Sequence, residues 1–167
     1  MPGFQIRPAT RDDAGTVLAF INKLAEYEKL SHECVATEEQ IAETLFGKRK
    51  YADVLLAEVD GVPVGFALYF YHYSTFRAAP TLWLEDLFVD PEQRGNGIGK
   101  ALLVELCKVA QSEGCARVEW WVLDWNEPSI EFYKSIGAVP MDEWTVYRMD
   151  DKAIDAFVSA DAGSTRI

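Results

Sequence analysis

A glycine-rich run, Gln93 to Lys100, holds the residues of this sequence that are best suited to binding a charged group. It has glycine at positions 95, 97 and 99, and a helix-like pattern follows it. The glycines allow the backbone to bend sharply, and the positive end of the following helix lies at the bend. The run therefore predicts a site for an anion such as a phosphate. A glycine-rich connection without any ligand is the alternative.

The spacing of these glycines argues against two common phosphate loops. A dinucleotide-binding loop has the pattern G-x-G-x-x-G, but counting from Gly95 or from Gly97 leaves a non-glycine at the last position. A P-loop has a hydroxyl residue after Gly-Lys to hold magnesium, whereas Ala101 stands there. The pattern that is present is Arg94-x-x-Gly97-x-Gly99.

Length and composition predict one soluble domain. The chain has 167 residues, 49% of them apolar, which is enough for a single core. We expect residues 1–158 to form this domain and residues 159–167 to form a flexible C-terminal tail. No apolar run approaches the ~20 residues of a membrane span, and no leader pattern is present, so we expect a cytoplasmic protein that does not contact a membrane.

The charge balance argues against one class of partner. A formal net charge of −11 does not suit a nucleic-acid surface, which needs clustered Lys and Arg. It favours a cationic substrate, although solubility alone would also explain it. Cys34, Cys107 and Cys115 are an odd number without the paired spacing of zinc ligands, so we expect buried reduced thiols and no metal.

Helix and strand patterns alternate along the chain. Capping patterns at Thr10 and Thr37 start two helices, and Asp60-Gly61 is a strong signal for a hairpin turn. Strands are predicted at 4–7, 54–59, 63–73, 82–89, 117–123 and 146–149. Helices are predicted from Thr10 to about Lys29, from Thr37 to Gly47, from the glycine loop to Gly114, and over 128–136 and 151–158.

This order of elements, together with the glycine loop, resembles the GNAT superfamily of N-acetyltransferases, whose loop binds the diphosphate of acetyl-coenzyme A. The resemblance implies an α/β (α+β) fold, the GNAT acyl-CoA N-acyltransferase fold. Its mostly antiparallel central sheet is flanked by helices and splayed between the fourth and fifth strands. Within the superfamily, several blocks look like the diamine branch, which contains the spermidine/spermine acetyltransferases and their thialysine-acetylating relatives. These blocks are residues 6–10, 24–28, 73–75, 84–86 and, most specifically, 125–133.

The resemblance implies which residues contact acetyl-CoA. The strand before the loop offers backbone groups to the pantetheine arm, the loop cradles the diphosphate, and the block near residue 126 lies near the thiol end. The implied residues are Leu87, Phe88, Val89, Arg94, Gly95, Asn96, Gly97, Ile98, Gly99, Lys100, Asn126, Glu127, Pro128 and Ser129.

The chemistry of acetyl transfer requires two proton transfers. An alkylammonium with a pKa of about 10.4 needs roughly 4.6 kcal/mol to lose its proton at pH 7. Glu85 is the predicted amine-binding carboxylate and base, acting directly or through water. An ordinary charge on a solvent-facing strand is the alternative. The alternation of side chains along the strand decides whether Glu85 or Asp86 faces the cleft. Tyr133 matches the tyrosine that reaches the coenzyme sulfur in relatives, and we expect it to protonate the departing thiolate as general acid.

The resemblance also implies an acidic and aromatic lining for an elongated amine. Its members are Tyr27, Glu28, Glu85, Glu119, Trp120, Trp121 and Glu143. Trp120 and Trp121 are neighbours on a predicted strand, so they should face opposite sides. Residues 74–76 and 122–124 look more like the thialysine branch, and Arg77 would suit a substrate carboxylate, which favours a lysine-like amino acid or diamine over a polyamine.

Three functions stay open at this point. The first is acetylation of a small amine, with acetyl-CoA as co-substrate and no metal. The second is a GNAT enzyme for another acceptor, such as a protein N-terminus or an aminoglycoside. The third is a module that senses acetyl-CoA without catalysis. The resemblance also implies a homodimer.

Overall fold

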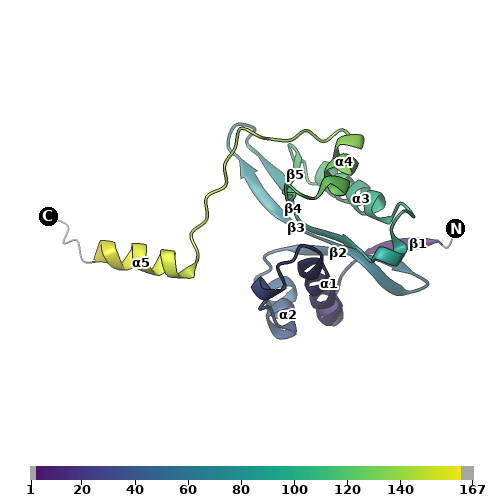
Figure 1. Cartoon of the computed structure of the whole chain (residues 1–167), viewed down its shortest axis with the longest axis horizontal. Helices are drawn as coiled ribbons and strands as arrows, with labels where there is room; N and C mark the ends of the chain where they lie inside the picture. The colour runs from purple at the N-terminus through teal and green to yellow at the C-terminus, as the bar shows by residue number, and fades with distance from the viewer. Residues whose placement is uncertain (1–2, 163–167) are drawn as a thin grey trace. The chain divides into compact units, whose positions relative to one another are not determined.

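The computed structural model describes residues 3–162 in two compact units. The first unit extends to Trp121, and the second begins at Val122 (Figure 1). The sequence-based domain over residues 1–158 stays a prediction.

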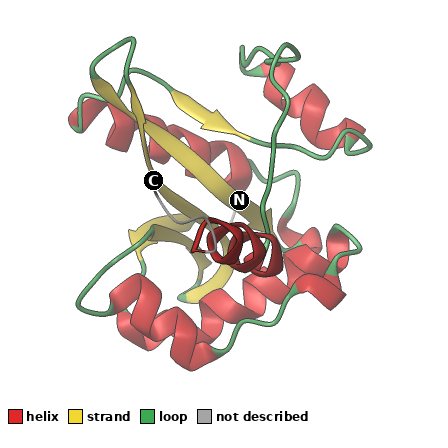
Figure 2. Ribbon diagram, turned by 90° about the vertical axis from the view of Figure 1, so that its left-hand side faces the viewer, coloured by secondary structure: helices red, strands yellow, loops and turns green. Residues whose placement is uncertain are grey.

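The first unit is built on a five-stranded mixed sheet in the order β1-β2-β3-β4-β5. The strands are β1 (Phe4–Pro8), β2 (Asp53–Val59), β3 (Val62–Ser74), β4 (Ala79–Val89) and β5 (Val118–Trp120). The first four pair antiparallel with their neighbours, and β5 runs parallel to β4 (Figure 2). The predicted hairpin is confirmed, because Asp60 and Gly61 turn between β2 and β3 with φ angles of 52° and 77°.

The sheet is open between β4 and β5, as the resemblance implied. Only three positions pair, ending with Leu84 opposite Trp120, while β4 continues to Val89. The predicted strand over 117–123 was therefore too long at both ends. A bulge in β4 directly after Leu84 disrupts the regular pairing pattern at the position where pairing with β5 ends.

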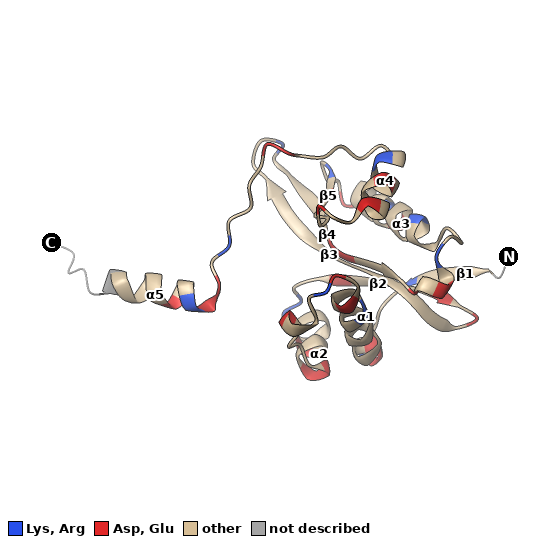
Figure 3. Cartoon of the chain, viewed as in Figure 1, with Lys and Arg blue, Asp and Glu red and all other residues tan. Residues whose placement is uncertain are grey.

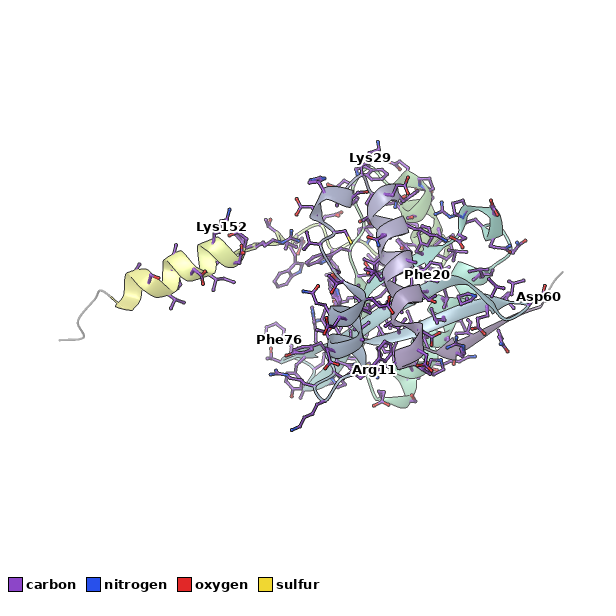
Figure 4. The ribbon with its side chains drawn as sticks, turned by 90° about the horizontal axis from the view of Figure 1, so that it is seen from below. Arg11, Phe20, Lys29, Asp60, Phe76 and Lys152 are labelled. Atoms are coloured by element: carbon purple, nitrogen blue, oxygen red, sulfur yellow. The ribbon has the colours of Figure 1, made fainter. Side chains whose placement is uncertain are left out.

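Two layers of helices cover the sheet. The helices α1 (Ala14–Tyr27) and α2 (Glu38–Phe46) lie on one face, and α3 (Ile98–Ser112) lies on the other (Figure 1). Phe20 lies on α1 (Figure 4). Its ring stacks on that of Phe66 in β3 with ring centroids 5.5 Å apart. The two predicted capping patterns are confirmed: Thr10 caps a short 3-10 turn leading into α1, and Thr37 caps α2.

An ionic network ties β1 and β2 to the start of α1. Arg7 contacts Asp13 Oδ2 at 2.8 Å, and its Nε donates to Glu58 Oε1 at 2.8 Å. Glu58 is buried, and Gln5 Nε2 donates to its second oxygen at 2.9 Å. These hydrogen bonds from Arg7 lower the pKa of both carboxyls. The network fixes the end of the sheet at which α1 begins.

The second unit contains the helices α4 (Glu127–Ser135) and α5 (Asp151–Ala162). The predicted strand over 146–149 was wrong: these residues are irregular, because a strand needs a partner and this part of the described chain supplies none. The terminal helix extends four residues past its predicted end at Val158, and residues 163–167 of the expected tail lie outside the described part.

Across residues 3–162, no helix combines the length and the apolar composition that crossing a bilayer requires.

Candidate active site

The glycine loop forms the bend that its sequence predicted. Gly97 is the N-cap of α3 and has a left-handed φ of 81°, and Gly95 has a φ of 80°. Other residues rarely adopt such values, so the bend requires glycine there. A Cβ built on either glycine meets no described atom within 4 Å, so the space beside the bend is open. The first N–H groups of α3 have no partners inside the helix, which makes this bend suitable for an anion.

Strand β4 leads directly to this loop with one edge lacking a paired strand. Leu87, Phe88 and Val89 pair with β3 on one side only, because β5 has ended. Phe88 and Val89 are buried, so their side chains belong to the core and only their backbone groups face the open edge. An extended ligand could lie along the open edge as an added strand does.

The bulge in β4 sits at Glu85. Leu68 of β3 pairs with Asp86 and the next residue, Tyr69, pairs with Leu84, so Glu85 is the extra residue. Leu68 belongs to the core under α1 and α2, and Asp86 opposite it points to the same face. Glu85 lies on that face too, because its Oε2 accepts a hydrogen bond of 2.9 Å from Trp83 Nε1. Simple alternation would have placed the two carboxyls on opposite faces.

A third carboxyl faces this pair from α1. Burial, the charge of Glu85 and the charge of Glu28 together raise the pKa of Asp86 to about 7, with burial the largest cause. Glu28 directly follows α1, and burial raises its pKa as well. The face thus concentrates negative charge in a chain that already carries 27 acidic and 16 basic side chains (Figure 3). A cation bound there would relieve the repulsion.

Aromatic side chains border the carboxyls. The His72 ring stacks on Trp83 with centroids 4.6 Å apart, and Trp121 contacts Trp83 edge-on at 5.0 Å. Glu119 pairs with Trp83 across β4 and β5, so it lies on the same face. Trp121 follows two residues later and is 55% exposed, while Trp120 points to the opposite face. Acids beside exposed aromatic rings form a surface suited to a cation.

Arg94 connects this surface to the glycine loop. Its guanidinium lies 5.0 Å from the centre of the Tyr27 ring and 5.4 Å from that of Phe88. Its Nε also donates to the carbonyl of Val89 at 2.9 Å. Arg94, which is predicted to contact the coenzyme, thus also holds the loop against the end of α1.

The remaining predicted residues belong to the second unit. Asn126 is buried and is the N-cap of α4, which places Glu127 and Pro128 in the first turn. Tyr133 lies on the same helix, and its ring centroid is 5.5 Å from that of Phe132. Glu143 and Trp144 are exposed in the irregular segment after α4.

Sequence reasoning did not include Trp83 or His72 in the site, and it considered Asp86 only as the alternative to Glu85. Two acids side by side in an apolar strand were a visible signal, but the bulge that brings both to one face depends on pairing with β3. Within residues 3–162 no group of three potential metal ligands occurs. The three cysteines are free, but Cys107 is exposed and Cys34 and Cys115 are only partly buried, so the prediction of buried thiols was wrong.

Comparison with known proteins identifies the family. The model of the acetyltransferase (GNAT) family matches residues 18–138. The chain belongs to the GNAT family. Members of this family use acetyl-CoA, and the open bend of Gly95 and Gly97 at the start of α3 fits its diphosphate.

Curated GNAT relatives narrow the branch. The thialysine N-epsilon-acetyltransferase of Bos taurus is 36% identical over 160 residues, covering 89% of this chain and 94% of the relative. That of Caenorhabditis elegans is 33% identical over 160 residues, covering 94% and 98%. The L-ornithine N5-acetyltransferase NATA1 of Arabidopsis thaliana is 31% identical, covering 91% and 86%. The chain is thus an acetyltransferase of the diamine and thialysine branch.

Solved structures confirm the GNAT fold. The integron cassette protein VCH_CASS6 from the mobile metagenome of V. cholerae superposes with a TM-score of 0.79 at 25% identity, covering 95% of this chain and 98% of that one. An aminoglycoside acetyltransferase, meta-AAC0020 from an uncultured soil metagenomic sample, superposes with a TM-score of 0.71 at 18% identity, covering 88% and 94%. At that identity the second likeness shows the fold alone.

Proposed function

We propose that this enzyme moves an acetyl group from acetyl-CoA to a primary amine of a small cationic molecule, by direct attack in a ternary complex. The observation that carries the proposal is that β4 joins an acidic, aromatic face to an anion-binding loop within a few residues. Acetyl-CoA supplies the acetyl group as a thioester. The loop from Gly95 to Lys100 would hold its diphosphate, and the open edge of Leu87 to Val89 would hold the pantetheine arm.

Glu85 is the proposed binding group for the ammonium. Its carboxylate is exposed, and the hydrogen bond from Trp83 orients it on the acidic face. A carboxylate attracts the cation but also raises the pKa of the amine, so the proton must be passed on, directly or through water.

Tyr133 is the proposed general acid. A thiol with a pKa of about 8.5 takes a proton from a phenol with a pKa of about 10 at an expense of only about 2 kcal/mol. The Tyr133 hydroxyl would protonate the departing sulfur. Asn126 to Ser129, at the start of the same helix, would contact the coenzyme near that sulfur atom. Support for these roles comes from the match of block 125–133 to the family.

The acceptor is proposed to be an amino acid with a side-chain amine, such as thialysine or ornithine. Relatives named for both compounds align over most of the chain, and each compound carries a carboxylate that a polyamine lacks. Arg77, exposed in the turn between β3 and β4, could pair with that carboxylate. The acidic lining would include Tyr27, Glu28, Glu119 and Trp121, with Trp120 and Glu143 as further members that the resemblance implies.

We further propose a cytoplasmic homodimer. Free thiols at all three cysteines suit a reducing compartment. The second unit exposes large apolar side chains along its irregular segment, including Trp144 at 76% and Tyr147 at 93%, and such a segment is typical of a protein interface. Sedimentation equilibrium would give twice the chain mass if the proposal holds.

The test of the activity is release of free thiol from acetyl-CoA with a panel of acceptors. Thialysine, lysine, ornithine, spermidine, an aminoglycoside and a peptide would be compared at equal concentration. Fastest release with the amino acids supports the proposal. Release only with the peptide or the aminoglycoside would assign another acceptor, and tight acetyl-CoA binding without any release would indicate a sensor.

A further inference from the structure

We propose that Asp86 is the carboxylate that finally accepts the proton lost by the substrate ammonium, whereas Glu85 holds the cation. The inference rests on the proposed function and assigns a role to a residue that lies in a family block but to which the resemblance gave no role. The starting observation is the bulge in β4, which turns two consecutive carboxyls to one face.

The two carboxyls have different surroundings although they are neighbours. Glu85 is exposed, and one of its oxygens already accepts a hydrogen bond from Trp83 Nε1. Asp86 is half-buried beside the core residue Leu68, with which it pairs across β3 and β4. An exposed, oriented carboxylate suits binding of a cation, and a carboxyl shielded from water suits storage of a proton.

Two charged groups act on Asp86, one from its own strand and one from the end of α1. Glu85 on its own strand and Glu28 at the end of α1 both oppose its ionisation. Arg94, from the loop, lies on the same side of the sheet over the rings of Tyr27 and Phe88. Burial is the largest influence, and together with the two carboxylates it raises the pKa of Asp86 to about 7.

A carboxylate with this pKa is a better base than an ordinary one. Relative to a glutamate near 4.3, its affinity for a proton is higher by several hundred-fold. Because the pKa is raised, Asp86 is protonated below pH 7 and becomes an available acceptor above it. Asp86 therefore gains and loses its proton near neutral pH, and a general base is most effective when its pKa lies near the working pH.

The proton balance of the reaction requires such a group. The ammonium begins with three N–H bonds, and the amide product retains one. Of the two protons that leave nitrogen, one replaces the proton that Tyr133 gives to the departing sulfur. The other passes to the Asp86 carboxylate and then to solvent, which returns Asp86 to its ionised form. The sum is one ammonium and one thioester giving one amide, one thiol and one free proton.

The first experiment compares Asp86→Asn with Glu85→Gln in pH profiles of kcat and kcat/KM. For the wild type we expect kcat/KM to fall below about pH 7, because the pH dependence of kcat/KM reports the pKa values of essential groups in the free enzyme. Asp86→Asn should lower kcat at least a hundredfold with little change in amine KM, and should abolish that fall. Glu85→Gln should mainly raise the amine KM and move the fall to lower pH, because it removes a negative charge that opposes ionisation of Asp86.

A second experiment separates proton transfer from a structural role. A substrate fluorinated beside the reacting nitrogen, so that its ammonium is largely deprotonated at neutral pH, needs no strong base. The loss caused by Asp86→Asn should shrink at least tenfold with this substrate. An equal loss with both substrates would overturn the proposal.

Direct titration covers the case in which Asp86→Asn does not fold. Carboxyl ¹³C NMR of the wild type should show one aspartate with a midpoint near pH 7, and assignment by Asp86→Glu identifies it. A midpoint below pH 5 for Asp86 would refute the inference. Absence of thiol release by the wild type with every amine would instead refute the proposed function. The NMR midpoint of Asp86 does not depend on that outcome, so the two failures can be distinguished.

Discussion

Replacing Gly97 by Asp tests the anion-binding bend with a matched control. Gly97 caps α3 with a φ of 81°, and a side chain there enters open space. Asn has the same shape, tolerates the left-handed region equally well and carries no charge. The backbone strain of about 1–2 kcal/mol is therefore shared by Gly97→Asn and Gly97→Asp, and their difference measures charge alone.

The size of that difference follows from Coulomb's law. A carboxylate on Gly97 would lie about 5 Å from a phosphate held by the first N–H groups of α3. With an effective dielectric constant of about 20, one pair of like charges at this distance repels by about 3.3 kcal/mol. Acetyl-CoA should therefore bind Gly97→Asp roughly 200-fold more weakly than Gly97→Asn.

Isothermal titration calorimetry at low and high salt gives the measurement, and circular dichroism checks that both variants fold. Screening should narrow the difference as ionic strength rises. Equal acetyl-CoA affinities of the Asp and Asn variants would refute the placement of the diphosphate at this bend.

Three further predictions follow from contacts in other parts of the chain. Tyr133→Phe should lower turnover tenfold or more and leave acetyl-CoA affinity unchanged, and stopped-flow thiol release with calorimetry would check both; unchanged turnover removes the phenol from the mechanism. Trp83→Phe removes the hydrogen bond to Glu85, so the amine KM should rise about fivefold while kcat stays within twofold; an unchanged KM would mean that the indole does not orient the carboxylate. Arg7→Met should reduce the free energy of unfolding by about 2 kcal/mol in urea denaturation at pH 7, whereas Arg11→Met, in an exposed ion pair, should change it by less than about 0.5 kcal/mol. Because the carboxyls paired with Arg7 have pKa values below their ordinary ones of 3.8 and 4.5, the contribution of Arg7 is complete above about pH 5.5 and is lost as the pH falls further. An effect of Arg7→Met that stayed at about 2 kcal/mol in acid would contradict this reading.

Local chemistry explains why much of the fold could be predicted. The pair Asp60-Gly61 determines a hairpin turn, and Thr37 with Gly47 brackets α2 at both ends. At the glycine loop the backbone needs a positive φ at position 97, and the presence of glycine there indicates this conformation. In each case residues near in sequence fix the geometry.

Features that depend on distant partners were missed. The strand expected over 146–149 has suitable residues, but pairing needs a second strand, and β propensity says nothing of whether one is present. The face to which the Asp86 side chain points depends on one extra residue in β4 relative to β3, because this residue shifts the alternation of side chains between the two faces of the sheet. The role of Arg94 as a brace depends on Tyr27, 67 positions away in the chain, lying under its guanidinium.

A crystal structure of the enzyme with coenzyme A and the best amine of the panel tests the central claim most directly. We expect the diphosphate within about 3 Å of backbone N–H groups between Gly95 and Lys100, and the substrate nitrogen within about 3 Å of a Glu85 oxygen. An amine bound away from the face of Glu85 and Asp86, or a diphosphate away from the bend, would contradict the account.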